Sequence, residues 1–113
     1  MLSSRRGRAT RDRTLDAVFA ALADPTRRRI LARLRAGSAY VGEIAAPFSM
    51  TLPAVTKHLR VLERAGIVTS EREGRFVRCR LEAKRLGDAS AFLAEYRPFW
   101  TDNLDQLAEY LEK

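Results

Sequence analysis

The sequence has few of the side chains that form disulfides or bind metals. It contains one cysteine, Cys79, and one histidine, His58, in 113 residues. One thiol cannot form a disulfide within the chain, and one thiol with one imidazole supplies too few soft ligands for a structural zinc site. We therefore expect no disulfide, no bound metal and no other cofactor.

Long hydrophobic runs are also missing. The longest stretch without a charged residue, Ile44 to Thr56, has 13 residues and includes two prolines, which excludes a membrane-spanning helix. The arginines near the N-terminus are not followed by an apolar block, so we expect no secretory signal. The composition, 46% apolar and 31% charged, is typical of one folded, soluble domain. We expect this domain to be cytoplasmic and to have no membrane partner.

Positive charge is what the sequence has in excess. The formal net charge is +7 and the isoelectric point is near 10.5. Residues 1–80 carry a net charge of +10, whereas residues 81–113 carry −3. A basic body suits a polyanion such as DNA, and an acidic C-terminal segment suits a contact with protein. The alternative is a basic surface that only keeps the chain soluble.

The first 13 residues contain five arginines and no apolar periodicity. This pattern predicts a flexible basic arm at residues 1–13, followed by one domain at residues 14–113. The arm either lies along DNA, for example in a minor groove, or serves solubility alone.

Helical spacing of apolar residues begins near Leu15 and predicts a first helix. A second helix is predicted after Asp24 and Pro25, which suit an N-cap and the first helical position, and Gly37 ends it. The predicted inward residues of these two helices are Leu15, Val18, Phe19, Leu22, Ile30, Leu31 and Leu34, and most arginines of the second helix are predicted to face outward.

Two more helices and a hairpin follow. A short third helix is predicted at residues 41–47, with Ser38 and Tyr40 as alternative caps, and a fourth helix runs from its cap Thr51 to a stop at Gly66. Two extended runs, residues 67–72 and 76–81, then flank Gly74, which can supply the positive φ of a tight hairpin. In the second run Cys79 alternates with arginines, which predicts a buried thiol.

The last predicted helical segment, from Leu86 to Leu111, carries an apolar seam suited to packing against another helix. Pro98 interrupts this segment, so the helix either kinks there or divides into two, with Pro98 opening the second. The seam consists of Leu93, Tyr96, Trp100, Leu104, Leu107 and Leu111.

The order of three helices, a tight turn between the last two and a basic hairpin predicts a winged helix-turn-helix, mainly α with a small β-hairpin wing. In the fourth helix an apolar face of Val55, Leu59 and Leu62 lies opposite a stripe without acidic residues. The residues expected to meet base edges in a major groove are Thr51, Leu52, Pro53, Thr56 and Lys57, and those expected to meet phosphates are Arg60 and Arg64.

The hairpin adds a second basic element, because Arg72 and Arg75 bracket its tip and can reach a minor groove or its phosphates. The alternative for the helix is an ordinary solvated basic face. His58 lies at the edge of the core face, where a histidine packed and bonded to backbone or phosphate is more plausible than a general base. With no phosphate loop and no nucleophile beside His58, we expect no enzymatic activity.

The strings LADPTRRRILARL, VGEIA, TLPAVTKHLRVLERAGIV and REGRFVRCRL resemble the ArsR family of bacterial transcriptional repressors. The resemblance implies a homodimer, built through the first and last helices, that represses transcription from an inverted-repeat operator, often its own. By position, it assigns DNA reading to Thr51, Leu52, Pro53, Thr56, Lys57 and His58, and the wing tip to Arg75. The dimer interface it implies consists of Leu15, Phe19, Leu93, Tyr96, Trp100, Leu104, Leu107 and Leu111.

Metal-sensing members of the family have a cysteine pair in the third helix, where this chain has none. Other members have acid and histidine ligands in the last helix, where this chain has acids alone. YRPFW and LDQLAEYL are similar to a subgroup without metal sites, which implies a metal-independent repressor. Two alternatives stay open: a repressor induced by oxidation of Cys79 or by a small molecule at the dimer seam, and a winged-helix module that binds protein.

Overall fold

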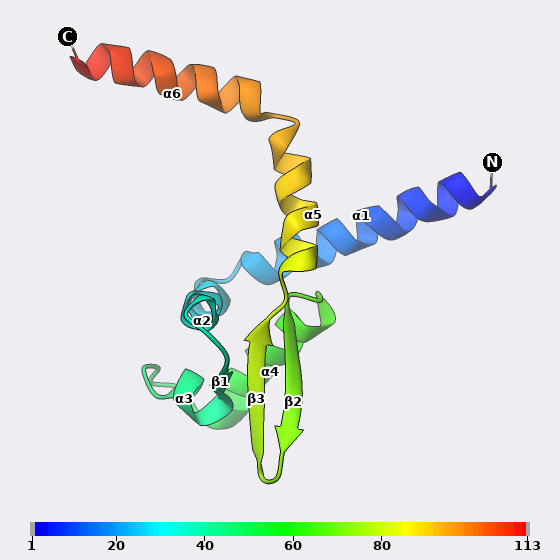
Figure 1. The fold of residues 1–113 in the computed structure, drawn as a ribbon, viewed down its shortest axis with the longest axis vertical. Coiled ribbons are helices and arrows are strands. Elements are labelled where there is room, and N and C mark those ends of the chain that lie inside the picture. The colour runs from blue at the N-terminus through cyan, green and yellow to red at the C-terminus, as the bar shows by residue number, and fades with distance from the viewer. Residues whose placement is uncertain (1, 113) are drawn as a thin grey trace.

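A computed structural model describes the backbone of residues 2–112 and the side chains of residues 12–112. Six helices and three strands follow one another along the chain (Figure 1). They are α1 (Leu2–Leu22), α2 (Pro25–Arg35), β1 (Ala39–Tyr40), α3 (Val41–Ala45), α4 (Leu52–Arg64), β2 (Val68–Glu73), β3 (Phe76–Leu81), α5 (Ala83–Ala94) and α6 (Arg97–Glu112).

The core lies where α1, α2, α3 and α4 meet the small sheet. Apolar side chains spaced three or four apart in each helix reach this centre, which gives each helix one buried face. The largest side chains that are fully buried are Val18, Ile30, Ile44, Val55, Leu62, Ile67, Val68 and Cys79. The predicted core faces of the second and fourth helices are therefore confirmed.

Local capping explains where the helices α2 and α4 begin. The carboxylate of Asp24 accepts a hydrogen bond of 3.0 Å from the backbone N–H of Arg27, and Pro25 opens α2. The hydroxyl of Thr51 accepts one of 3.3 Å from the N–H of Ala54 at the start of α4. Both caps were predicted, because oxygen-bearing side chains before a helix satisfy its first free N–H groups.

The sheet has three antiparallel strands in the order β1-β3-β2, one more than the sequence predicted. The predicted hairpin is β2 and β3, and Gly74 at its turn has a φ of +63°. The additional strand, β1, pairs Ala39 with Cys79 and has only two residues, so no alternation could reveal it. Tyr40, the last residue of β1, is also the N-cap of α3. The helix α3 ends at Ala45, earlier than expected.

The helix α1 begins at Leu2, so residues 2–13 of the expected arm are helical, and residue 1 lies outside the described residues. Arginine and alanine favour helix, and residues 2–13 contain no proline. The helix whose later residues pack into the core therefore extends through this segment as well. The expected boundary between residues 13 and 14 is thus not an end of secondary structure.

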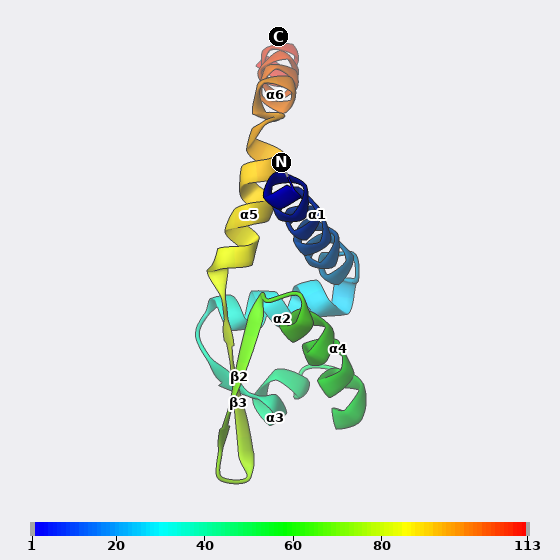
Figure 2. The same ribbon diagram turned by 90° about the vertical axis from the view of Figure 1, so that its right-hand side faces the viewer.

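The last segment divides into two helices at the predicted position, and Pro98 is the second residue of α6. A proline is tolerated in the first turn, where its missing N–H would have no helical partner. Figures 1 and 2 show α5 rising from the sheet and α6 turning away from it, at the opposite end of the molecule from the hairpin tip. None of the helices in the described part of the chain is both long and apolar enough to cross a membrane.

Candidate nucleic-acid interface

The helix α4 presents two opposite faces. Val55, Leu59 and Leu62 are buried against the core. Lys57, Arg60 and Arg64 are exposed on the other side, and none of the three forms an ion pair with any side chain of residues 12–112. The stripe predicted from helical spacing therefore stands outward with its cations unneutralised, as a surface for phosphate or base edges requires.

The first turn of α4 is also accessible. Thr51, Leu52 and Pro53 are exposed and Thr56 is half-buried. Leu52 keeps 55% of its surface in solvent, although leucine is usually buried. An exposed aliphatic group at the start of such a helix can contact the methyl group of thymine in a major groove.

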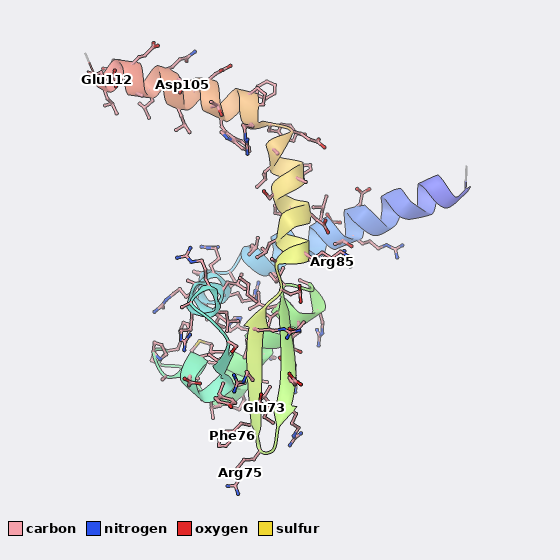
Figure 3. The ribbon with its side chains drawn as sticks, in the orientation of Figure 1. Glu73, Arg75, Phe76, Arg85, Asp105 and Glu112 are labelled. Atoms are coloured by element: carbon pink, nitrogen blue, oxygen red, sulfur yellow. The ribbon has the colours of Figure 1, made fainter. Side chains whose placement is uncertain are left out.

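The wing extends beyond the body of the protein, and its tip is basic. Figure 3 shows Arg75 pointing away from the closed end of the hairpin, with Phe76 beside it. Arg72, on the other side of the tip, donates a hydrogen bond of 3.3 Å from Nε to the carbonyl of Gly74. Both predicted wing arginines are therefore exposed, and Arg75 is the one whose guanidinium extends past the turn.

An open groove of about 440 Å³ separates α4 from the wing. Leu52, Thr56 and Arg60 line it from the helix, whereas Arg75 and Phe76 line it from the hairpin. The fold thus brings the two predicted basic elements to one side of the molecule, across a single groove.

His58 does not share the exposed stripe. Its side chain is only 22% exposed, and its Nδ1 lies 3.4 Å from Nη1 of Arg27 and 3.9 Å from Oδ2 of Asp24. A packed histidine at the edge of the helix was predicted, and its partners within the chain are two side chains at the start of α2, those of Arg27 and Asp24. The role in DNA reading that the family resemblance assigns to His58 stays a prediction that this orientation does not favour.

Several arginines of α2, which were predicted to lie mostly outward, make contacts within the chain that the sequence did not predict. Arg27 is half-buried and Arg28 donates a hydrogen bond of 2.8 Å to the carbonyl of Leu22. The guanidinium carbon of Arg29 lies 4.8 Å from the ring centre of Phe48. Periodicity could not reveal these contacts, because a long arginine side chain can turn back to a helix end.

A polar cluster on the wing was also missed by sequence reasoning. The hydroxyl of Tyr40 donates a 2.7 Å hydrogen bond to Glu73, and Nε of Arg78 lies 3.0 Å from Oε1 of the same carboxylate. The Tyr40 hydroxyl and the Arg78 guanidinium hold the pKa of Glu73 below its ordinary value. The pairing of β1 and β2 with β3 brings these residues together, and this pairing joins positions that are far apart in the sequence.

Cys79 is buried in β3, as predicted. Its Sγ lies 3.5 Å from the hydroxyl oxygen of Ser70, which donates a hydrogen bond to Glu63. Burial raises the pKa of the Cys79 thiol above its usual range, and the nearby Glu63 carboxylate acts in the same direction. This environment disfavours the reactive thiolate.

The residues of the expected dimer interface divide into two groups. Leu15 and Phe19 are half-buried within the chain, and the Phe19 ring lies 5.8 Å from that of Phe92 on α5. The other group is exposed, with exposed fractions from 38% at Trp100 to 72% at Leu111. Its members are Leu93, Tyr96, Trp100, Leu104, Leu107 and Leu111.

Among residues 12–112 no three acidic, histidine or cysteine side chains come together in a way that could hold a metal ion.

Comparison with known proteins identifies the family. A family model described as a helix-turn-helix domain matches residues 22–71. The transcriptional repressor SdpR of Bacillus subtilis is 34% identical to this chain over 79 residues, which are 70% of this chain and 88% of SdpR. A crystal structure of an ArsR family transcriptional regulator is 41% identical, with a TM-score of 0.74, over 80% of this chain and 93% of that one.

A third similarity concerns assembly. The solution structure of a homodimeric winged helix-turn-helix DNA-binding domain from Mycobacterium bovis, a possible ArsR-family regulator, is 26% identical with a TM-score of 0.64. The match covers 88% of this chain and 89% of that domain. The relatives are transcriptional regulators, not enzymes. The predicted fold and family are thus confirmed, and the chain belongs to the ArsR family of winged helix-turn-helix transcriptional regulators.

Proposed function

We propose that this protein is a metal-independent repressor that binds an inverted-repeat operator as a homodimer in the cytoplasm. The observation that carries the proposal is the exposure of Lys57, Arg60 and Arg64 on the outer face of α4, where Arg60 lines the groove that Arg75 of the wing also lines. A helix of this kind enters a major groove while the wing reaches the adjacent minor groove or its phosphates.

The proposed homodimer rests on the apolar seam of α5 and α6. Trp100, Leu104 and Leu107 expose large apolar surfaces at the end of the molecule opposite the wing. Covering these surfaces with the same helices of a second copy would remove them from water and place two copies of α4 in successive major grooves. The similar domain from Mycobacterium bovis is itself homodimeric.

The proposed independence of metal rests on residue types. The stretch from Glu43 to Pro47 carries no cysteine, and the acids of α5 and α6 have no histidine beside them. Hard carboxylates alone do not form the thiolate or imidazole sites that soft metals require.

The test is a titration of purified protein against the DNA upstream of its own gene, at several salt concentrations. We expect sequence-specific binding whose affinity falls steeply with salt, because phosphate contacts release counterions. Lys57→Ala should weaken operator binding by about 1–3 kcal/mol if Lys57 meets a base. Lys84→Ala, which removes an exposed lysine on α5, is the matched control and should bind normally.

The absence of any binding to DNA at low salt would contradict the proposal. Binding to a protein partner without salt dependence would instead support the protein-interaction module. Equal losses in Lys57→Ala and Lys84→Ala would show that net charge alone, and not the α4 stripe, sets the affinity.

A further inference from the structure

One guanidinium group joins the end of α1 to the recognition helix α4. Arg27 lies in the first turn of α2, and its Nε donates a hydrogen bond of 2.7 Å to the carbonyl of Ala21. Its Nη2 donates another, of 3.0 Å, to the carbonyl of Ala20. The last carbonyls of a helix have no partner within the helix, and Arg27 donates to two of them in α1. The carbonyl of Ala20 also accepts a hydrogen bond of 3.2 Å from the N–H of Ala23.

The third nitrogen of the same group faces α4. Nη1 of Arg27 lies 3.4 Å from Nδ1 of His58, which accepts this hydrogen bond when its proton resides on Nε2. Asp24 closes the cluster, because its carboxylate caps α2 at the N–H of Arg27 and lies 3.9 Å from His58. Each of the three guanidinium nitrogens thus has a partner on one of two different helices, an arrangement that suits the planar, branched guanidinium better than the single ammonium of a lysine.

The two helices that Arg27 joins have different tasks in the proposed function. The helix α1 packs against α5, with Phe19 and Phe92 in contact, and α5 continues the apolar seam proposed for dimerisation. The helix α4 carries Lys57, the neighbour of His58 in sequence, on the surface proposed to read DNA. The contact between Arg27 and His58 thus lies between the dimerisation helices and the recognition helix.

We infer that Arg27 and His58 are positioning residues that set the direction of α4 relative to the dimerisation helices. The inference rests on the proposed function. In a dimer this direction fixes the separation of the two recognition helices, which must match half-sites about 34–36 Å apart. Loss of the contact relaxes the preference for one half-site spacing, while the contacts of each α4 with its own half-site persist.

The experiment compares binding to one operator at several half-site spacings. The operator is the inverted repeat recovered when wild-type protein is selected against random duplex DNA, and the probes insert or remove one base pair between its half-sites. Wild-type protein should prefer one spacing. Arg27→Ala and His58→Leu should each reduce that preference by about fivefold or more, the usual size of a coupling between sites.

The chain offers matched controls. Arg28→Ala also removes a hydrogen bond to a terminal carbonyl of α1, that of Leu22, whereas the side chains that hydrogen-bond or pair with His58 in the described residues are those of Arg27 and Asp24. His58→Asn retains an acceptor oxygen near the place of Nδ1. Both variants should keep the wild-type spacing preference. Binding to an isolated half-site should be unchanged in Arg27→Ala and Arg28→Ala, because neither arginine belongs to the surface proposed to read DNA. The double variant Arg27→Ala/His58→Leu should be no worse than either single one, because both remove the same contact.

Two outcomes would overturn the inference while the proposed function stands. One is an unaltered spacing preference in both Arg27→Ala and His58→Leu. The other is an equal loss in Arg28→Ala, which would assign the effect to the capping of α1 alone. A wild-type protein that selects no operator would overturn the proposed function, and the inference would fail with it.

Discussion

The guanidinium of Arg78 lies 4.8 Å over the ring of Tyr40 and donates a hydrogen bond of 2.7 Å to its hydroxyl group. Tyr40 belongs to β1 and Arg78 to β3, and both contact the carboxylate of Glu73 at the end of β2. The three strands of the sheet are thus connected by one polar cluster close to the wing tip. Glu73 is the last residue of β2 before the turn, so the cluster lies next to the segment that carries Arg75.

The cluster predicts an acid-sensitive wing. The folded protein holds the pKa of Glu73 below its ordinary value of 4.5, first through the Tyr40 hydroxyl and then through Arg78. Glu73 therefore contributes stability above pH 4.5, and this contribution is lost as the pH falls through the lower folded pKa. The unfolding free energy of wild-type protein should fall more steeply with acid than that of Glu73→Gln, as measured by urea unfolding at several pH values.

A second acidic group must be separated from the first in this measurement. The pKa of Asp24 is also lowered, mainly by its hydrogen bond from the N–H of Arg27. Asp24→Asn should therefore lose a different part of the acid response and keep the part that belongs to Glu73. Identical pH profiles for wild-type protein and Glu73→Gln would show that the wing cluster does not contribute.

The buried face of α4 predicts a large loss of stability on truncation. Leu62 is completely buried, so Leu62→Ala should lower the unfolding free energy by about 2–5 kcal/mol, from the lost burial and the cavity left behind. Leu52→Ala, on the exposed side of the same helix, should change it by less than about 0.5 kcal/mol. Urea unfolding monitored by circular dichroism measures both changes. Equal losses in the two variants would contradict the assignment of Leu62 to the buried face and Leu52 to the exposed face of α4.

Much of the fold was predictable because its signals are local. Asp24 and Thr51 cap helices through hydrogen bonds to residues three positions away, and Gly74 adopts the positive φ that its turn requires. The buried faces follow from spacing alone, as Val55 and Leu62 show. Such features need no knowledge of what the rest of the chain does.

The features that sequence did not predict depend on distant parts of the chain. Tyr40 becomes part of a strand because β3 lies beside it, and Arg27 turns inward because the end of α1 and His58 offer acceptors. The residues of the candidate DNA surface were predicted from the sequence. The groove between α4 and the wing was not, because it depends on how these two elements pack in the folded chain. Pro98 allowed a kink or a division, and the structure shows a division.

The exposed seam predicts a dimer that a single charge weakens. Leu107 is 52% exposed in the isolated chain, so Leu107→Glu would place a carboxylate in the proposed apolar interface. We expect the dimer dissociation constant to rise by about tenfold or more, equivalent to at least about 1.4 kcal/mol, in sedimentation equilibrium. Gln106→Glu adds the same charge on another face of α6 and should leave the dimer intact. A wild-type protein that is monomeric at all concentrations would contradict the prediction.

The environment of Cys79 predicts that oxidants do not control DNA binding. Burial raises the pKa of the thiol, which further disfavours the thiolate at neutral pH, and the side chain is buried. A thiol-reactive dye should label native protein at least about tenfold more slowly than protein in urea, because labelling requires opening of β3. Peroxide should then release DNA equally little from wild-type protein and from Cys79→Ser. Release from wild-type protein alone would instead establish Cys79 as the sensor of a redox-regulated repressor.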